Sequence, residues 1–353
     1  MGTMAEMLST PLGVIEWFVY LLAAVMFVIG LHLMNSPKTA RKGNMVSAIG
    51  MVFAVAMAFI VLFAGEASNG FKHGVAVIVL IVGIVIGAVA GVVSAKKVKM
   101  TDMPQLVSVF NTVGGGAAAL VALNDILTSA ETPSIVVLIT AGLGIMIGSV
   151  TFSGSLIAAG KLQGIKWVKK LSLPGKGFWN ILFVVLTIVS FVMLCVQPNQ
   201  RLLWSILTTV FALCYGLVFV IPIGGADMPV VISVLNACTG TAVAMSGLAI
   251  NNIALIVAGA LVGAAGVTLS IAMSKAMNRP LLSVLAGGFG GSNSAAGAGE
   301  GLEGTMKETS ADDLAVQLVY AEKVIFVPGF GLAQAQACLL YTSPSPRDMR
   351  RSR

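Results

Sequence analysis

Two asparagines placed deep in apolar segments are the residues of this sequence best suited to carry chemistry. Asn111 ends the stretch Asp-Met-Pro-Gln-Leu-Val-Ser-Val-Phe-Asn that starts at Asp102, and Asn236 ends a second copy, Asp-Met-Pro-Val-Val-Ile-Ser-Val-Leu-Asn, that starts at Asp227. Nine helical residues span roughly 13 Å, which places both amides near the middle of a bilayer. A buried amide needs a hydrogen-bond partner or water. Each is therefore either a structural link between helices or part of a hydrated path, and the sequence leaves both interpretations open.

The sequence surroundings of the two aspartates that begin these copies predict different roles for them. An Asp followed by a Pro in the first turn is typical of a helix start, and the three lysines between residues 96 and 99 favour this structural interpretation for Asp102. Asp227 has no basic neighbour and follows Gly224-Gly-Ala. A carboxylate at the cytoplasmic mouth of a membrane path can relay protons or sense an adjoining domain. Asp227 is therefore a candidate proton-pathway residue.

Hydroxyl groups alternate along the fifth predicted span, from Ser149 to Ser155. Most hydroxyls at this spacing bond their own helix backbone, and we expect Ser155 to be the one that faces a hydrated interior. Apart from Glu16 at the outer edge of the first span, the predicted spans place no charged residue or His near the midplane. This disfavours a voltage sensor or a charge-paired transport site. The four cysteines show neither metal-binding nor disulfide spacing.

The elements that must position these residues are transmembrane helices. The chain has 353 residues, of which 57% are hydrophobic and 10% are charged, and its mean hydropathy is +0.97. Apolar segments of bilayer length recur through most of it, which predicts an all-α polytopic membrane protein. The sequence predicts about nine spans, at residues 13–33, 45–65, 74–95, 103–123, 134–160, 179–197, 202–222, 228–249 and 253–277.

The repeat extends beyond the asparagine segments. Ala90-Gly-Val-Val corresponds to Tyr215-Gly-Leu-Val, and Gly148-Ser-Val-Thr-Phe-Ser corresponds to Ala265-Gly-Val-Thr-Leu-Ser. Corresponding spans lie four apart in the chain, so they point in the same direction. The fold is therefore predicted to contain a parallel internal repeat, unlike the inverted repeats of many transporters.

The distribution of basic residues predicts the orientation in the membrane. The formal net charge is +7, and lysines and arginines gather in alternate short loops. This pattern places the N-terminus outside and the C-terminus in the cytoplasm, and it disfavours nucleic-acid binding. The N-terminus lacks the basic start of a signal peptide.

The composition changes after the last span and divides the chain into four parts. Residues 1–280 form the predicted transmembrane domain, and residues 281–304 form a Gly-rich linker. Residues 305–337 begin with a helix start at Ser310 and continue with an apolar strand that ends in Gly329-Phe-Gly, the opening of a dinucleotide-binding α/β domain. Residues 338–353 break every earlier pattern and are interpreted as a non-native tail.

Several short motifs together resemble the beta subunit of the proton-translocating NAD(P) transhydrogenases. The resemblance extends from the first span to about Gln336 and rests on Met103-Pro-Gln-Leu-Val, Gly148-Ser-Val-Thr-Phe-Ser-Gly-Ser, Gly224-Gly-Ala-Asp-Met-Pro-Val-Val, Gly259-Ala-Leu-Val-Gly, Lys275-Ala-Met-Asn-Arg, Ala286-Gly-Gly-Phe-Gly and Val327-Pro-Gly-Phe-Gly. In that family, inward proton flow drives hydride transfer from NADH to NADP⁺. The membrane part shifts the NADP(H) domain between states of different affinity. The resemblance implies a partner alpha subunit that holds NAD(H), a homodimer of alpha–beta units, and a location in the bacterial inner membrane.

The resemblance also implies roles for individual residues. Asn236 matches the polar channel residue and Asp227 the acidic residue at its mouth, while Gly329, Phe330, Gly331 and Ala333 match the first NADP(H) loop. This sequence departs from the family pattern by having Phe330 where Tyr is usual and by lacking the Val-Ala that often precedes Gln-Ala-Gln.

At Asn111 many members have a His that is considered the proton carrier, and an amide does not titrate. Either water or another group therefore carries the proton in this chain. The 353 residues contain only the start of the nucleotide domain, so we expect them alone to bind no nucleotide tightly. The alternative hypothesis is a stand-alone secondary transporter or channel.

Overall fold

The computed structural model describes residues 10–64, 70–99, 102–129, 133–165, 175–277, 280–286, 311–320 and 323, and the regular elements in these ranges are all helical. The chain divides into two units, residues 1–294 and 295–353. Within the described residues, nine helices are long and apolar enough to cross a membrane. This confirms the prediction of an all-α polytopic protein with about nine spans.

Several of the spanning helices are longer than the predicted apolar segments. For example, α3 begins at Ala40 and so includes Arg41 and Lys42, because helical hydrogen bonding continues into the interface, where these side chains reach water. The bounds of the spanning helices are α2 Pro11–Leu33, α3 Ala40–Ala64, α4 Gly70–Lys97, α5 Met103–Thr128, α6 Ile135–Leu162, α8 Lys176–Val196, α9 Arg201–Val220, α10 Met228–Ala249 and α11 Ile253–Ala276.

Short polar residues fix several helix starts. Thr10 Oγ1 accepts a hydrogen bond from the Gly13 N–H at 3.2 Å at the start of α2, and Asn252 Oδ1 accepts one from the Leu255 N–H at 3.1 Å at the start of α11. These N-caps satisfy backbone donors that have no partner within the helix. The turn between α10 and α11 is tight, with Asn251 at a φ of 54°, a conformation that Asn tolerates better than most residues.

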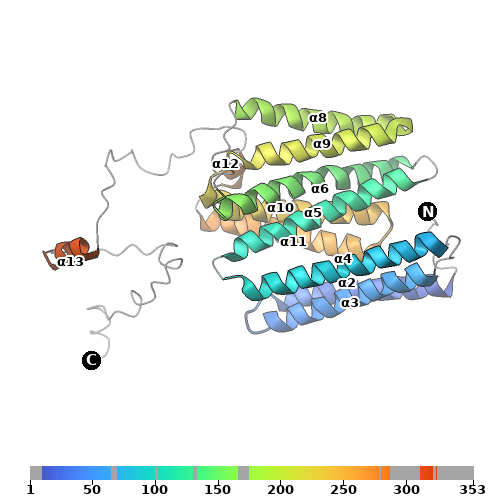
Figure 1. Cartoon of the computed structure of the whole chain (residues 1–353), viewed down its shortest axis with the longest axis horizontal. Coiled ribbons are helices and arrows are strands. Elements are labelled where there is room, and N and C mark those ends of the chain that lie inside the picture. Colours follow the sequence, from blue (N-terminus) through green and yellow to red (C-terminus); the bar gives the residue numbers. More distant parts are fainter. Residues whose placement is uncertain are drawn as a thin grey trace. The chain divides into compact units, whose positions relative to one another are not determined.

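The helices pack around α6 and α10 (Figure 1). Helix α6 contacts α5, α8, α9 and α10, whereas α10 contacts α5, α6 and α11. Helices α8 and α9 form a pair on one side of this centre, and α2 and α3 form a pair on the other side, joined to it through α11. The largest apolar cluster lies where α6, α9 and α10 meet the short helix α12 (Leu281–Ala286), which contributes Val284. The centre of the bundle therefore contains α10, one of the two predicted asparagine helices, and the other, α5, packs against both central helices.

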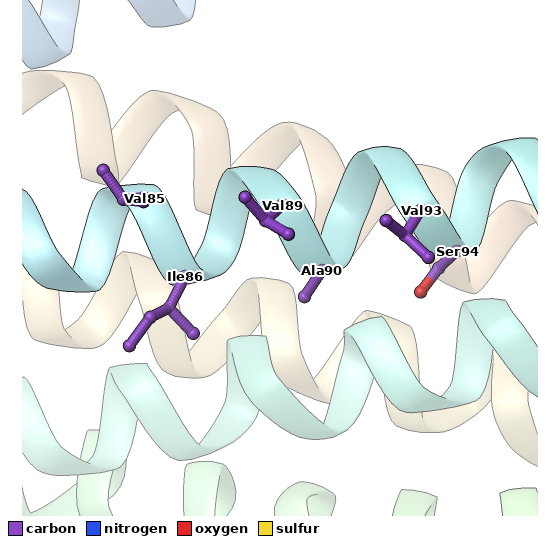
Figure 2. Close-up of a pocket in the computed structure, with 6 residues that line it drawn as sticks. All are labelled: Val85, Ile86, Val89, Ala90, Val93 and Ser94. Carbon is purple, nitrogen blue, oxygen red and sulfur yellow. The ribbon is translucent and has the colours of Figure 1, made fainter.

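Helix α4 has little buried surface. In its most apolar 18-residue window no residue is buried, and Figure 2 shows a shallow apolar groove along it. The groove is lined by Val85, Ile86, Val89, Ala90, Val93 and Ser94. Because the bilayer interior is as apolar as these side chains, their exposure has no hydrophobic cost in a membrane.

Two glycines allow close contact within the central helix pairs. A Cβ added to Gly115 on α5 would lie 3.1 Å from the Gly148 carbonyl oxygen of α6. A Cβ added to Gly240 on α10 would lie 2.7 Å from the Gly259 carbonyl oxygen and 2.3 Å from the Gly263 nitrogen of α11. Small residues of this kind let membrane helices approach closely where lipid supplies no hydrophobic driving force.

Replacing Gly240 by Ala is therefore expected to destabilise the folded protein by about 1–3 kcal/mol, because the methyl group meets rigid backbone and α11 must move away. Thermal unfolding of the purified protein in detergent measures this change. The matched control is Gly83→Ala, at a position on α4 where an added Cβ meets nothing within 4 Å. Equal melting temperatures for the two variants would contradict the expected clash.

In the second unit the structure describes helix α13 (Ala311–Tyr320), with Asp312 and Asp313 in its first turn, where acidic residues favour helix formation. This confirms the helix predicted to start near residue 310, although Ser310 itself is outside the described residues. The linker predicted at residues 281–304 is wrong for its first six residues, which form helix α12 and place Val284 in the apolar core. The rest of the predicted linker, the Gly-x-Gly loop and the tail lie outside the described residues. The α/β character of this segment stays a prediction.

Candidate functional site

Asn111 lies inside the helix bundle and bonds to α6. It is 5% exposed, and its Nδ2 donates a hydrogen bond of 2.8 Å to Oγ of Ser155, which is fully buried. The sequence analysis singled out both residues separately, and the structure brings them together. Because the bond joins two side chains from different helices, it fixes the amide plane at the α5–α6 contact.

Two further hydroxyls support this pair. Ser108, one turn before Asn111 on α5, donates from Oγ to the Ser155 carbonyl oxygen at 2.7 Å, and Thr112 Oγ1 donates to the Ser108 carbonyl oxygen at 2.9 Å. Ser155 is thus held from α5 through both its backbone and its side chain. Buried hydrogen bonds between two helices, such as these, help to fix how the helices are arranged.

Two of the buried side-chain oxygens that have no hydrogen-bond partner among the described residues lie on the neighbouring helices α5 and α10. They are Asn111 Oδ1 on α5 and Thr239 Oγ1 on α10. The methyl group of Thr239 lies 3.5 Å from where a Cβ on Gly114 would stand, so Thr239 faces α5 within one turn of Asn111. Leaving a buried polar atom unpaired costs about 1–3 kcal/mol. Water is the partner that such sites usually hold.

Asn236 lies on α10 three residues before Thr239 and is half-buried. Helix α10 is joined to two of its neighbours by serines: Ser246 donates to the Ala118 carbonyl oxygen of α5 at 3.0 Å, and Ser233 donates to the Gly266 carbonyl oxygen of α11 at 3.1 Å. The two predicted amides therefore lie on helices that contact each other, and Asn111 is the more deeply buried of the two.

The structure places both aspartates directly before their helices, as predicted. Asp102 precedes α5 and is exposed, whereas Asp227 ends the short 3₁₀ turn η3 (Gly225–Asp227) before α10 and is half-buried. Neither side chain forms the hydrogen bond of an N-cap. The two carboxylates thus differ in burial. The different roles that the sequence analysis predicts for them stay predictions.

The hydroxyls of α6 divide into two groups. Thr151 Oγ1 donates to the Gly148 carbonyl oxygen at 2.9 Å and Ser153 Oγ donates to the Ser149 carbonyl oxygen at 3.2 Å, which confirms the predicted bonding to their own helix. Ser155 differs, because its hydroxyl accepts a bond from Asn111. It is one helical turn from Thr151, so both face α5.

Three residues of this region were not selected from the sequence: Ser108, Thr239 and Lys161. Ser108 has a counterpart, Ser233, within the duplicated stretch, and that repetition was a usable signal. Thr239 follows Asn236 by one turn, and Lys161 was counted only as a loop charge. The predicted nucleotide residues Gly329, Phe330, Gly331 and Ala333 lie outside the described residues.

The fold and the site together define a class of protein. It is a polytopic helical membrane protein with a buried, uncharged polar cluster where three central helices meet. The sequence profile of the family described as NAD(P) transhydrogenase beta subunit matches residues 16–341. The chain belongs to that family. The alternative hypothesis of a stand-alone transporter or channel is not supported by this membership.

Two relatives from Rhodospirillum rubrum, one of them assigned to a named strain, are NAD(P) transhydrogenase beta subunits. Each is 40% identical to this chain over 327 residues, which is 90% of this chain and 68% of the relative. The family match, which runs from residue 16 to residue 341, includes the helices that carry Asn111, Ser155 and Asn236.

Proposed function

We propose that this chain couples inward proton translocation to hydride transfer from NADH to NADP⁺ as the beta subunit of a membrane-bound transhydrogenase. Its partner is an alpha subunit that binds NAD(H), and two alpha–beta units form a homodimer in a bacterial inner membrane. The N-terminus lies outside and the C-terminus lies in the cytoplasm, as the loop charges indicate. Family membership supports the activity, and the buried polar cluster supports the proton path.

The observation that carries the proton path is the pair of buried oxygens without partners, Asn111 Oδ1 and Thr239 Oγ1. Since neither side chain can take up or release a proton near neutral pH, the proton moves along water that these oxygens orient. Asn111, held by Ser155, fixes one side of this water site. Asn236, one turn from Thr239, extends the polar lining on α10. The path thus uses Asn111, Ser155 and Asn236 as orienting groups.

Asp227 is proposed as the carboxylate at the cytoplasmic mouth of this path. It lies at the start of α10, the helix that carries Asn236 and Thr239, so a helix of fixed length joins it to the buried site. A carboxylate in this place can exchange protons with water and report the charge of the path to the cytoplasmic domain.

The parallel internal repeat gains support from matched contacts. Gly115 and Gly240 occupy the same position in the two copies, and each lets the second helix of its pair approach closely. Ser108 and Ser233 also correspond, and each donates a hydrogen bond to a backbone carbonyl of that second helix. We infer that α5–α6 and α10–α11 are duplicated helix pairs that face each other across the path.

The nucleotide-binding part of the proposal rests on the resemblance of the segment after Lys323. Gly329, Phe330, Gly331 and Ala333 are proposed to form the first NADP(H) loop, in a domain that begins in residues 305–337 and follows the linker at 281–304. A Gly-rich loop after a strand lets backbone N–H groups approach a pyrophosphate. Residues 338–353 are proposed to have no part in this domain.

The subunit assembled with its alpha partner in proteoliposomes tests the proposed coupling. NADPH formation from NADH is expected to accelerate by about tenfold when an inward proton gradient is imposed, because inward proton flow drives the reaction. A protonophore should abolish the acceleration. Equal rates with and without the gradient would contradict the proposed function.

A further inference from the structure

Lys161, in the last turn of α6, reaches across to the C-terminus of α9. Its Nζ donates hydrogen bonds to the backbone carbonyl oxygens of Val220 at 3.2 Å, Ile221 and Ile223 at 2.8 Å. These carbonyls belong to the last residue of α9 and to the turn that follows it. The side chain is half-buried, so it connects two central helices at one end of the bundle.

The end of a helix is a favourable place for this ammonium group. The last carbonyls of α9 lack helical partners, and the helix dipole concentrates negative charge there. Hydrogen bonds with a charged donor are shorter and stronger than those between neutral groups. Lysine suits three oxygens arranged around one point, because its ammonium is compact, whereas arginine presents a planar fork.

Gly224 and Gly225 follow the backbone carbonyl groups that Lys161 bonds, and they have no close packing contacts at the position of a side chain. A Cβ added to Gly224 or Gly225 would meet nothing within 4 Å. Asp227 comes two residues after Gly225 and starts α10. The bonds from Lys161, together with the buried side chains of Ile221 and Ile223, therefore hold the beginning of the turn that leads to Asp227.

On its own helix, Lys161 follows Ser155 by six residues, or fewer than two turns. One rigid segment of α6 thus contacts Asn111 at one point and the turn before Asp227 at another. We propose that Lys161 is a positioning residue that sets the place of Asp227 relative to the Asn111–Ser155 site. This inference rests on the proposed function only where it concerns proton coupling.

Hydrogen–deuterium exchange of the assembled enzyme tests the positioning directly. In Lys161→Met the amides of residues 221–227 are expected to exchange about tenfold faster than in the unmodified enzyme, because local opening of the turn becomes easier. Lys161→Arg should keep only part of the protection, because a planar guanidinium does not match three oxygens arranged around one point. The matched control is Lys97→Met, which removes an exposed lysine from the last turn of α4. Unchanged exchange in Lys161→Met would overturn the proposal.

A double-mutant cycle tests the functional part. Lys161→Met is expected to lower gradient-driven NADPH formation by about fivefold, while adding less than about twofold in an Asp227→Asn background, because both changes affect one unit. Independent, multiplicative losses would overturn a role through Asp227. If exchange rises but Asp227→Asn itself has no effect, the positioning holds and the proposed proton path fails. If Lys161→Met does not assemble, Lys161→Gln, which keeps a hydrogen-bond donor without the charge, takes its place in both experiments. The same outcomes then support or overturn the proposal.

Discussion

Replacing Asp227 by Asn is expected to lower gradient-driven NADPH formation by about tenfold or more, because the amide cannot exchange protons at the mouth of the path. The substitution preserves the size of the side chain, and Asp227 forms no side-chain cap on α10, so the helix start should survive. Initial rates in proteoliposomes with an imposed gradient measure the effect.

The control for this prediction is Asp102→Asn. Asp102 holds the equivalent position before α5, but it is exposed and close to three lysines in sequence. Its loss should change the rate by less than about twofold, as expected for a solvent-screened charge. Equal losses in the two variants would show that burial and charge surroundings do not distinguish the two copies.

Replacing Asn111 by Leu should have the larger effect, a loss of about 100-fold in the same assay. Leucine has a similar volume but removes the donor to Ser155 Oγ and the unpaired Oδ1, so the buried site loses the groups that orient water. Asn124→Leu is the matched control, because Asn124 lies on the same helix and is exposed. Full activity in Asn111→Leu would remove this site from the proton path.

Asn111→His provides a second arm of the same experiment. An imidazole at this position can still bond Ser155, and it adds a group that can take up and release a proton. The variant should remain active and gain a pH dependence that the unmodified subunit lacks. An unchanged pH profile in an active variant would show that position 111 does not contact the moving proton.

The spans and the duplicated motif could be predicted from the sequence because apolar length and repetition are properties of the chain itself. The boundaries could not, since helices such as α3 continue past the apolar segment into the interface. Asn111 and Ser155 were each predicted as candidates, yet their contact is a matter of which helices pack together, and no local pattern encodes it.

Lys161 shows more clearly that contacts between helices cannot be predicted from local sequence. In sequence it is one of several lysines near a loop, and its partners are carbonyl oxygens about 60 residues further along the chain. Every residue has a backbone carbonyl group, so no sequence motif identifies the ones that Lys161 bonds. Thr239 was missed for a related reason: its significance lies in lacking a partner, which only the packed structure shows.

The enclosed position of α6 has a consequence for how the protein is made. During synthesis α6 enters the membrane before α8 to α11, three of which, α8, α9 and α10, later surround it. A newly inserted helix whose hydroxyls needed those absent neighbours would expose unpaired polar groups to lipid. Thr151 and Ser153 avoid this because their hydroxyls bond carbonyls of α6 itself, and the partners of Ser155 are on α5, which is synthesised earlier. The order of the helices along the chain thus lets the Asn111–Ser155 contact form during synthesis, before α10 adds Asn236 and Thr239 to the site.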